Sequence, residues 1–170
     1  MNTISEKRFG LGSEHPLCDR IQIIFLLLFF FIWGIDAISL LIVGYSTVII
    51  GIILFPLLSI PALIFFVLSF YLVAKSHDVI FSESNTHQKF IESGVYSWVR
   101  HPMYLGILLF CLGFLFLMVS ILSIMIWIAF FIIYDRMATY EEKELIKILG
   151  NKYLSYQNRV LKWLPWIRIH

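Results

Sequence analysis

Long apolar runs separated by short polar segments dominate the chain. The first run covers residues 21–43 and carries Asp36 as its only formal charge. The second run covers residues 48–74 and contains prolines at 56 and 61. A helix of ~20 apolar residues spans the hydrocarbon core of a bilayer. Each run is therefore predicted to cross a membrane.

A third apolar run, residues 104–134, carries no formal charge. It is too long for one crossing and long enough for a tight hairpin of two short helices, with "VSILS" at 119–123 as the expected turn. The second run is also longer than one crossing needs, so either it tilts or kinks, or Pro56 and Pro61 split it into two pieces. The pattern predicts an all-α integral membrane protein with about four transmembrane helices, including a C-terminal helical hairpin.

Composition supports the membrane class. Of the 170 residues, 60% are hydrophobic and 14% are charged, whereas soluble domains average about 25% charged residues. The length suits one domain. Its expected parts are an N-terminal segment (1–20), two crossings (21–74), a polar loop (75–103), the hairpin (104–134) and a charged tail (135–170). The tail is expected to contain an amphipathic helix, with Leu145, Ile148 and Leu149 as its apolar stripe.

The positive charges predict the orientation. All thirteen lysines and arginines fall before residue 21, in the loop at 75–103, or from Arg136 onward. An even number of crossings puts these three segments on one side of the membrane, and the positive-inside rule makes that side cytoplasmic. We therefore expect a multi-pass protein with both termini in the cytoplasm and with any reactive site on that face.

Metal chemistry is not indicated. Cys18 and Cys111 stand far apart, and no Cys or His spacing resembles a metal site. We expect buried single thiols, no bound metal and no nucleic-acid partner. A carboxylate such as Asp36 costs free energy inside a crossing and is a functional candidate by default. If Asp36 lies near the outer turn, water can hydrate it and no function is implied. Both interpretations stay open.

The stretch "SGVYSWVRHPMYLG" at residues 93–106 gathers polar side chains at the start of the hairpin. Taken alone, it is compatible with a simple helix start at a membrane edge. Pro102 suits the first turn of a helix, and Arg100 and His101 suit anchoring at lipid headgroups. A second polar group follows the hairpin in the tail, beginning at Glu141.

Read together, "GVYSWVRHPMYLG" and "EEKELIKILGNKYLSYQNRVLKWLPWI" resemble the isoprenylcysteine carboxyl methyltransferase family and its prokaryotic and phospholipid methyltransferase relatives. The matching positions are Gly94, Tyr96, Arg100, His101, Pro102, Tyr104, Gly106, Glu141, Glu142, Gly150, Tyr153, Tyr156, Arg159 and Pro165. Leu149 stands where the family has phenylalanine. The match covers roughly residues 88–165, and the N-terminal half resembles the family only in hydropathy.

The resemblance implies a membrane methyltransferase that uses S-adenosyl-L-methionine. In the family, the cofactor lies in a pocket closed by the Arg-His-Pro segment, the hairpin and the tail. The cofactor-binding residues carried over are Gln88, Lys89, Phe90, Ile91, Tyr96, His101, Pro102, Met103, Tyr104 and Glu141. Arg136 is the candidate catalytic and substrate-binding residue that faces the acceptor, with a spacing to Glu141 one residue longer than in eukaryotic members.

These residue types suit methyl transfer. An in-line displacement depends on positioning and needs no metal. Carboxylates can hold the cofactor's ammonium, tyrosine faces can pack against cations, and an arginine can orient an acceptor carboxylate. By contrast, Glu142 and Glu144 are expected to be solvated. The aromatic residues of the tail are expected to pack or to lie at the membrane interface; these are Tyr153, Tyr156, Trp163 and Trp166.

Three functions stay open. The first is a methyltransferase acting on a lipid-like or prenylated acceptor, such as the carboxylate of a prenylated cysteine, a phospholipid amine or an isoprenoid. The second is an NADPH-dependent oxidoreductase similar to membrane sterol and steroid reductases, whose C-terminal halves share a hairpin and a basic aromatic tail but typically carry a tryptophan that this tail lacks at the matching place. The third is a non-enzymatic four-helix membrane protein.

Overall fold

The computed structural model of the chain describes residues 18–44, 48–50, 54–83 and 90–164. These residues form five α-helices, a 3-10 turn and two short strands. The elements are α1 (Cys18–Val43), β1 (Val48–Ile50), α2 (Phe55–Glu83), η2 (Gly94–Ser97), α3 (Pro102–Leu117), β2 (Val119–Ser120), α4 (Ile121–Leu149) and α5 (Asn151–Gln157). The predicted all-α class is confirmed, apart from the two strands.

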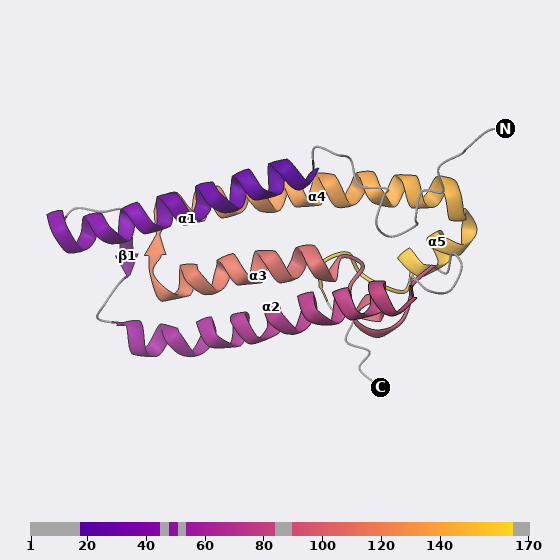
Figure 1. Cartoon of the computed structure of the whole chain (residues 1–170), viewed down its shortest axis with the longest axis horizontal. Helices are drawn as coiled ribbons and strands as arrows, with labels where there is room; N and C mark the ends of the chain where they lie inside the picture. The colour runs from indigo at the N-terminus through magenta and orange to yellow at the C-terminus, as the bar shows by residue number, and fades with distance from the viewer. Residues whose placement is uncertain (1–17, 45–47, 51–53, 84–89, 165–170) are drawn as a thin grey trace.

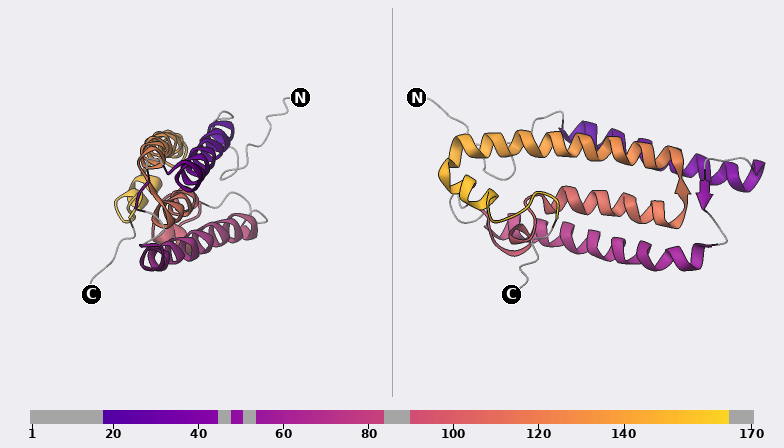
Figure 2. Two further views of the ribbon diagram at one scale, coloured as in Figure 1. Left: turned by 90° about the vertical axis from the view of Figure 1, so that its left-hand side faces the viewer. Right: turned by 180° about the vertical axis from the view of Figure 1, so that it is seen from behind.

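Four helices run side by side along the long axis of the molecule, with α3 in the middle (Figure 1). Seen end-on, α1 and α4 lie on one side of α3 and α2 lies on the other (Figure 2). The short helix α5 lies at the end where α3 begins and α4 finishes, whereas β1 and β2 lie at the opposite end (Figure 1). The structure therefore has one end rich in polar connections and one end closed by a small strand pairing.

Three of the described helices are long and apolar enough to cross a membrane, over Arg20–Ile42, Phe55–Val79 and Ile121–Leu149. Their surfaces expose large apolar side chains, such as Leu41 and Ile42 in α1, as expected where a helix faces lipid. The predicted integral membrane class is therefore confirmed. Helix α3 has 16 residues, which is about 24 Å at 1.5 Å per residue.

The second apolar run does not begin as a helix. Its first residues form β1, which pairs antiparallel with β2 through Val48 opposite Ser120 and Ile50 opposite Val119. Helix α2 then starts at Phe55 with Pro56 in its first turn, and Pro61 lies inside the same helix. Helix α2 is continuous through both prolines. Pro56 is tolerated because a proline in the first turn removes an N–H that has no partner within the helix.

The hairpin of α3 and α4 turns at residues 118–120, at the edge of the predicted turn. Ser120 caps α4, since its hydroxyl accepts a hydrogen bond from the backbone N–H of Ser123 at 3.2 Å. Helix α4 then continues without a break to Leu149, well past Tyr134, the last residue of the predicted hairpin. The polar residues beyond Tyr134 are strong helix formers, so they extend α4 instead of starting a separate tail helix.

Glycines let α3 lie close against α2. A Cβ atom added at Gly106 would lie 2.7 Å from Cγ2 of Val73 and 3.3 Å from the carbonyl oxygen of Ser69. A Cβ atom at Gly113 would lie 2.6 Å from the ring of Phe66. Small residues at such contacts allow the close backbone approach on which helix association in lipid depends.

A second core lies between α1, α3 and α4. Phe29, Leu108, Cys111 and Phe130 are all buried there. The predicted burial of the Cys111 thiol is confirmed. Asp36 of α1 is also buried, with 6% of its surface exposed.

We predict that Gly106→Ala lowers the free energy of unfolding relative to Gly34→Ala. Both changes gain about 1 kcal/mol of helix propensity. At Gly34 nothing lies within 4 Å of the added Cβ, whereas overpacking at position 106 costs about 1–3 kcal/mol. Reversible unfolding in mixed micelles measures the difference. Equal stability of the two variants would contradict the proposed close contact of α2 and α3.

Candidate functional site

Three segments that are distant in the sequence meet at the polar end of the molecule. The first is the Arg-His-Pro segment, which follows η2 and leads into α3. Gly94 begins η2 with a φ of 61°, a backbone conformation that glycine adopts at little cost. Pro102 occupies the first turn of α3, where proline is favoured. The other two segments are the second half of α4 and the chain from α5 to residue 164.

The buried carboxylate of Glu142 joins these segments. It forms an ion pair with Arg100, Nε to Oε1, at 2.9 Å. Nε2 of His101 lies 3.1 Å from the same oxygen, and the side-chain amide of Gln157 donates to Oε2 at 3.1 Å. Arg100 also donates from its guanidinium to the carbonyl of Gln157 at 3.1 Å. Glu142 thus connects the start of α3, the middle of the polar half of α4 and the end of α5.

The neighbouring carboxylate of Glu141 faces the other side of the same histidine. It accepts a hydrogen bond from the hydroxyl of Tyr104, and its Oε2 lies 3.6 Å from Nδ1 of His101. The rings of His101 and Tyr104 stack with an interplanar angle of 4°. One imidazole therefore lies between two carboxylates, with Tyr104 holding the outer one in place.

Stacked aromatic rings continue from this histidine into the core between α3 and α4. Tyr104 stacks on Tyr134 at 4.8 Å between centroids, and Tyr134 stacks on Phe130 at 4.5 Å. Such offset pairs contribute beyond simple burial. The hydroxyl of Tyr134 is buried and has no hydrogen-bond partner among the described residues. The stack fixes the position of Tyr104 and, through it, that of Glu141.

The chain after α5 returns to α4 and covers His101. Lys162 donates to the carboxylate of Asp135 at 2.7 Å and to the hydroxyl of Thr139 at 2.7 Å. The indole of Trp163 donates to the same carboxylate at 2.9 Å, and its ring lies 6.1 Å from that of His101. These contacts hold the ring of Trp163 beside the imidazole, which is 8% exposed.

Burial lowers the pKa of His101, although its hydrogen bond with Glu142 acts in the opposite direction. The imidazole is 8% exposed, and its charged form loses hydration there. Lys162 and Arg100 also lower this pKa. His101 is therefore held in its neutral form near pH 7.

Burial also raises the pKa of Tyr153 and of Tyr156. These two rings pack on Phe90 at centroid distances of 5.5 and 5.2 Å. The hydroxyl of Tyr156 donates to the carbonyl of Tyr96 at 2.6 Å. The predicted packing role of these two tail tyrosines is confirmed.

The predicted cofactor residues fall into three groups. His101, Pro102, Met103, Tyr104 and Glu141 lie together at the junction of α3 and α4. Phe90, Ile91 and Tyr96 lie on the chain that leads into it, where Phe90 packs against the tail. Gln88, Lys89 and the tail residue Trp166 lie outside the described residues.

Arg136 is not brought into this group. Its side chain is exposed on α4, whereas Tyr134, Ala138 and Glu142 occupy the buried face of the same helix. Arg136 is thus free to meet a molecule that approaches from outside the bundle.

One expectation was wrong. Glu142, expected to be solvated, is 7% exposed because it lies four residues after the buried Ala138 on one face of α4. Arg100, for which headgroup anchoring was one alternative, forms an ion pair with Glu142 and donates to the backbone carbonyl of Gln157. The place of Glu142 among the positions that match the family motif was the available signal, but hydropathy alone could not separate it from Glu141.

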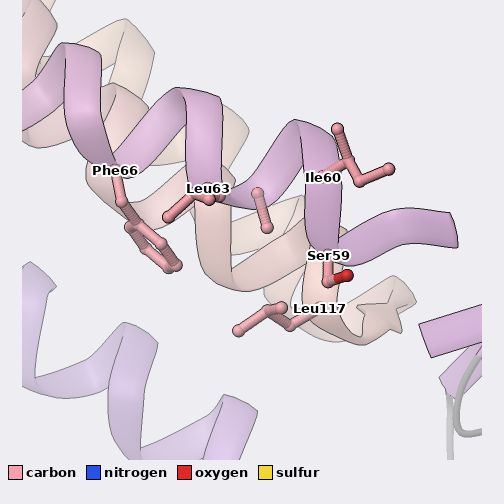
Figure 3. A pocket seen from close by; sticks show the side chains of 6 residues that line it. Ser59, Ile60, Leu63, Phe66 and Leu117 are labelled. Carbon is pink, nitrogen blue, oxygen red and sulfur yellow. The ribbon is translucent and has the colours of Figure 1, made fainter. Parts of the chain in front are cut away.

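An apolar groove of about 320 Å³ lies far from this site, between the first half of α2 and the end of α3 (Figure 3). It is lined by Ser59, Ile60, Ala62, Leu63, Phe66 and Leu117. With a single hydroxyl in its wall, it lacks the charged groups that a polar cofactor requires. Within the described part of the chain, no group of three or more His, Cys, Asp or Glu residues is arranged to hold a metal ion.

Known proteins similar to this chain are methyltransferases. The profile of a family described as phospholipid methyltransferase matches residues 39–152. The chain is 36% identical over 96 residues to protein-S-isoprenylcysteine O-methyltransferase of Saccharomyces cerevisiae, covering 54% of this chain and 38% of that protein. It is 34% identical over 98 residues to the enzymes of that name from Mus musculus and Homo sapiens, covering 55% of this chain and 33% of each. The chain thus matches about a third of the length of these relatives.

We predict that Arg100→Met destabilises the protein by about 3–5 kcal/mol, because it leaves the Glu142 carboxylate buried without its ion pair. Lys147→Met is the matched control. It removes an ion pair with Glu144 on the surface of α4 and should leave stability unchanged. The free energy of unfolding in mixed micelles is measured for both variants and compared with that of the wild type. A neutral effect of Arg100→Met would show that the ion pair does not hold the three segments together.

Proposed function

The chain belongs to the phospholipid methyltransferase family, and on this basis we propose that it is an integral membrane methyltransferase that uses S-adenosyl-L-methionine. The proposed acceptor is a lipid-like or prenylated molecule. The observation that carries the proposal is the meeting of His101, Tyr104 and Glu141 at one buried junction, since these are three of the residues that the resemblance assigns to the cofactor.

The residues at this junction suit the amino-acid end of the cofactor. Oε2 of Glu141 and Nδ1 of His101 lie 3.6 Å apart, and both are acceptors when the imidazole is neutral with its proton on Nε2. A primary ammonium can donate to both at once, and a hydrogen bond to a carboxylate is among the stronger ones available. The stacked rings of His101 and Tyr104 form the adjoining wall.

When bound, S-adenosyl-L-methionine supplies an electrophilic methyl group on a sulfonium sulfur. The chain's contribution to such an in-line displacement is to orient the two reactants. Tyr104, His101 and Glu141 orient the donor. Trp163, held by Asp135, covers the site and excludes water, which strengthens electrostatic contacts inside it. A carboxylate acceptor attacks as the anion and needs no general base.

We place the acceptor on the side of Arg136. This guanidinium is exposed on α4 and can bind a carboxylate through two parallel hydrogen bonds. The similarity to isoprenylcysteine methyltransferases supports an apolar acceptor that ends in a carboxylate. The apolar exterior of the helices supports delivery of such an acceptor through the bilayer.

In the proposed topology, α3 is a fourth crossing and both termini are cytoplasmic. Its length of 16 residues falls short of the ~30 Å hydrocarbon core, but α3 lies between α2 and α4 (Figure 1) and its ends are continued by η2 and β2. The distribution of the thirteen lysines and arginines supports a cytoplasmic polar end. The candidate site then lies at the cytoplasmic interface, beside the amphipathic end of α4 and α5.

The first test is cofactor binding. S-adenosyl-L-methionine should give a calorimetric binding signal and raise the thermal midpoint of the protein in lipid nanodiscs. Glu141→Gln should weaken binding by about tenfold or more, because a hydrogen bond to a charged group contributes about 1.5–3 kcal/mol. Glu144→Gln changes a half-exposed carboxylate of α4 whose ion pair is with Lys147, and this variant should bind as the wild type does. Absence of a signal from folded protein, or stabilisation by NADPH instead, would refute the methyltransferase proposal, and the latter would favour a reductase.

The second test is acceptor recognition. With labelled S-adenosyl-L-methionine, the protein should transfer the methyl group to a component of total membrane lipid or to a prenylated cysteine. Arg136→Gln should raise KM for a carboxylate acceptor by about tenfold or more and leave the cofactor affinity unchanged. An unchanged KM would remove Arg136 from the acceptor site without affecting the assignment of the cofactor site.

A further inference from the structure

We propose that Glu142 is a positioning residue that fixes the tautomer of His101, with the ring proton on Nε2 and the lone pair of Nδ1 directed to the cofactor site. The tautomer can be observed without any ligand. What Nδ1 binds rests on the function proposed above. Glu142 itself is buried behind the imidazole and acts through it.

The two nitrogens of His101 have different surroundings. Nε2 lies 3.1 Å from Oε1 of Glu142, within hydrogen-bond distance. Nδ1 lies 3.6 Å from Oε2 of Glu141, beyond it. A neutral imidazole carries one N–H, and the stronger partner determines which nitrogen holds it. The proton therefore belongs on Nε2.

The surroundings of Glu142 support the same assignment. The guanidinium of Arg100 forms an ion pair with its carboxylate at 2.9 Å, and the side-chain amide of Gln157 donates to Oε2 at 3.1 Å. Both contacts favour the ionised carboxylate, whose oxygens only accept hydrogen bonds. In the bond to His101 the ring must then supply the proton. The carboxylate cannot turn away from the imidazole without breaking these contacts.

Burial keeps the imidazole neutral, and the charged groups around it act in both directions. Arg100 and Lys162 oppose its protonation and Glu142 favours it, but burial has the largest effect and lowers its pKa. Glu141 faces the other edge of the ring at 3.6 Å. Only a neutral ring has two tautomers, because the charged ring carries a proton on both nitrogens.

The tautomer decides what the site can bind. With the proton on Nε2, the lone pair of Nδ1 and the carboxylate of Glu141 are two acceptors that face each other, and a shared N–H donor such as a primary ammonium relieves their repulsion. With the proton on Nδ1, the ring itself would donate toward Glu141 and compete with the ammonium. An outer partner that sets the tautomer in this way typically changes ligand affinity by about 10–100-fold, as measured for metal-bound histidines.

Nitrogen-15 NMR of histidine-labelled protein in nanodiscs reads the tautomer directly, with His101→Gln used only to assign the signal. The wild type without ligand should show a protonated Nε2 and an unprotonated Nδ1. Arg100→Met combined with Glu142→Leu removes both buried charges together, so neither is left unpaired. This double variant should shift the proton toward Nδ1 and weaken S-adenosyl-L-methionine binding by about tenfold or more.

Two further variants separate positioning from simple stability. Glu142→Gln keeps an oxygen that accepts from Nε2 and should retain the wild-type tautomer and most of the affinity. Glu144→Gln should change neither. A wild-type ring protonated on Nδ1, or a double variant that keeps both the tautomer and the affinity, would overturn the inference. If the ring proton moves in the double variant but the wild-type protein binds no S-adenosyl-L-methionine, the proposed function is refuted and the tautomer assignment is supported.

Discussion

The ion pair between Arg100 and Glu142 holds together the polar end of the molecule. Glu142 is buried and Arg100 is largely buried, and burying an unpaired charge costs several kcal/mol. Each is therefore stable in its place only when the other is present. The side-chain amide of Gln157 donates to the other carboxylate oxygen of Glu142, and the backbone carbonyl of Gln157 accepts a hydrogen bond from Arg100. The start of α3, the side of α4 and the end of α5 are thus joined by one small network of an ion pair and hydrogen bonds, on which the position of His101 depends.

The membrane explains why this network lies at one end. Within the hydrocarbon core every backbone polar group needs a partner in the protein, which helices supply internally. Polar side chains cost less free energy where the helices leave the hydrocarbon core, so specific polar contacts form mainly there. At the opposite end, the short strand β1 pairs with β2 through backbone hydrogen bonds. Between the ends, glycines at 106 and 113 bring α3 against α2, and aromatic rings fill the space toward α4.

The sequence predicted the parts of this structure that depend on local pattern. Continuous apolar runs predicted α1, most of α2 and the hairpin, and Pro102 marked the start of α3. The family resemblance is confirmed. Strand β1 was not predicted because it depends on a partner at Ser120 that is distant in the chain. Glu142 was expected to be solvated and is buried, because two adjacent carboxylates on a helix differ in the neighbour that each one faces, and that neighbour is set by how α3 docks on α4.

The two arginines that flank the hairpin, Arg100 and Arg136, also differ in burial and in the partner that each one faces. Arg100 carries its own permanent counter-ion, so a ligand carboxylate would have to displace Glu142 and leave it buried without a partner. Arg136 is exposed and loses little when an anion replaces water around it. An acceptor carboxylate arriving from the bilayer also loses hydration at the interface, where the lower effective dielectric strengthens its attraction to a guanidinium. Burial therefore assigns Arg100 to holding the polar end together and leaves Arg136 as the arginine that can bind the proposed acceptor carboxylate.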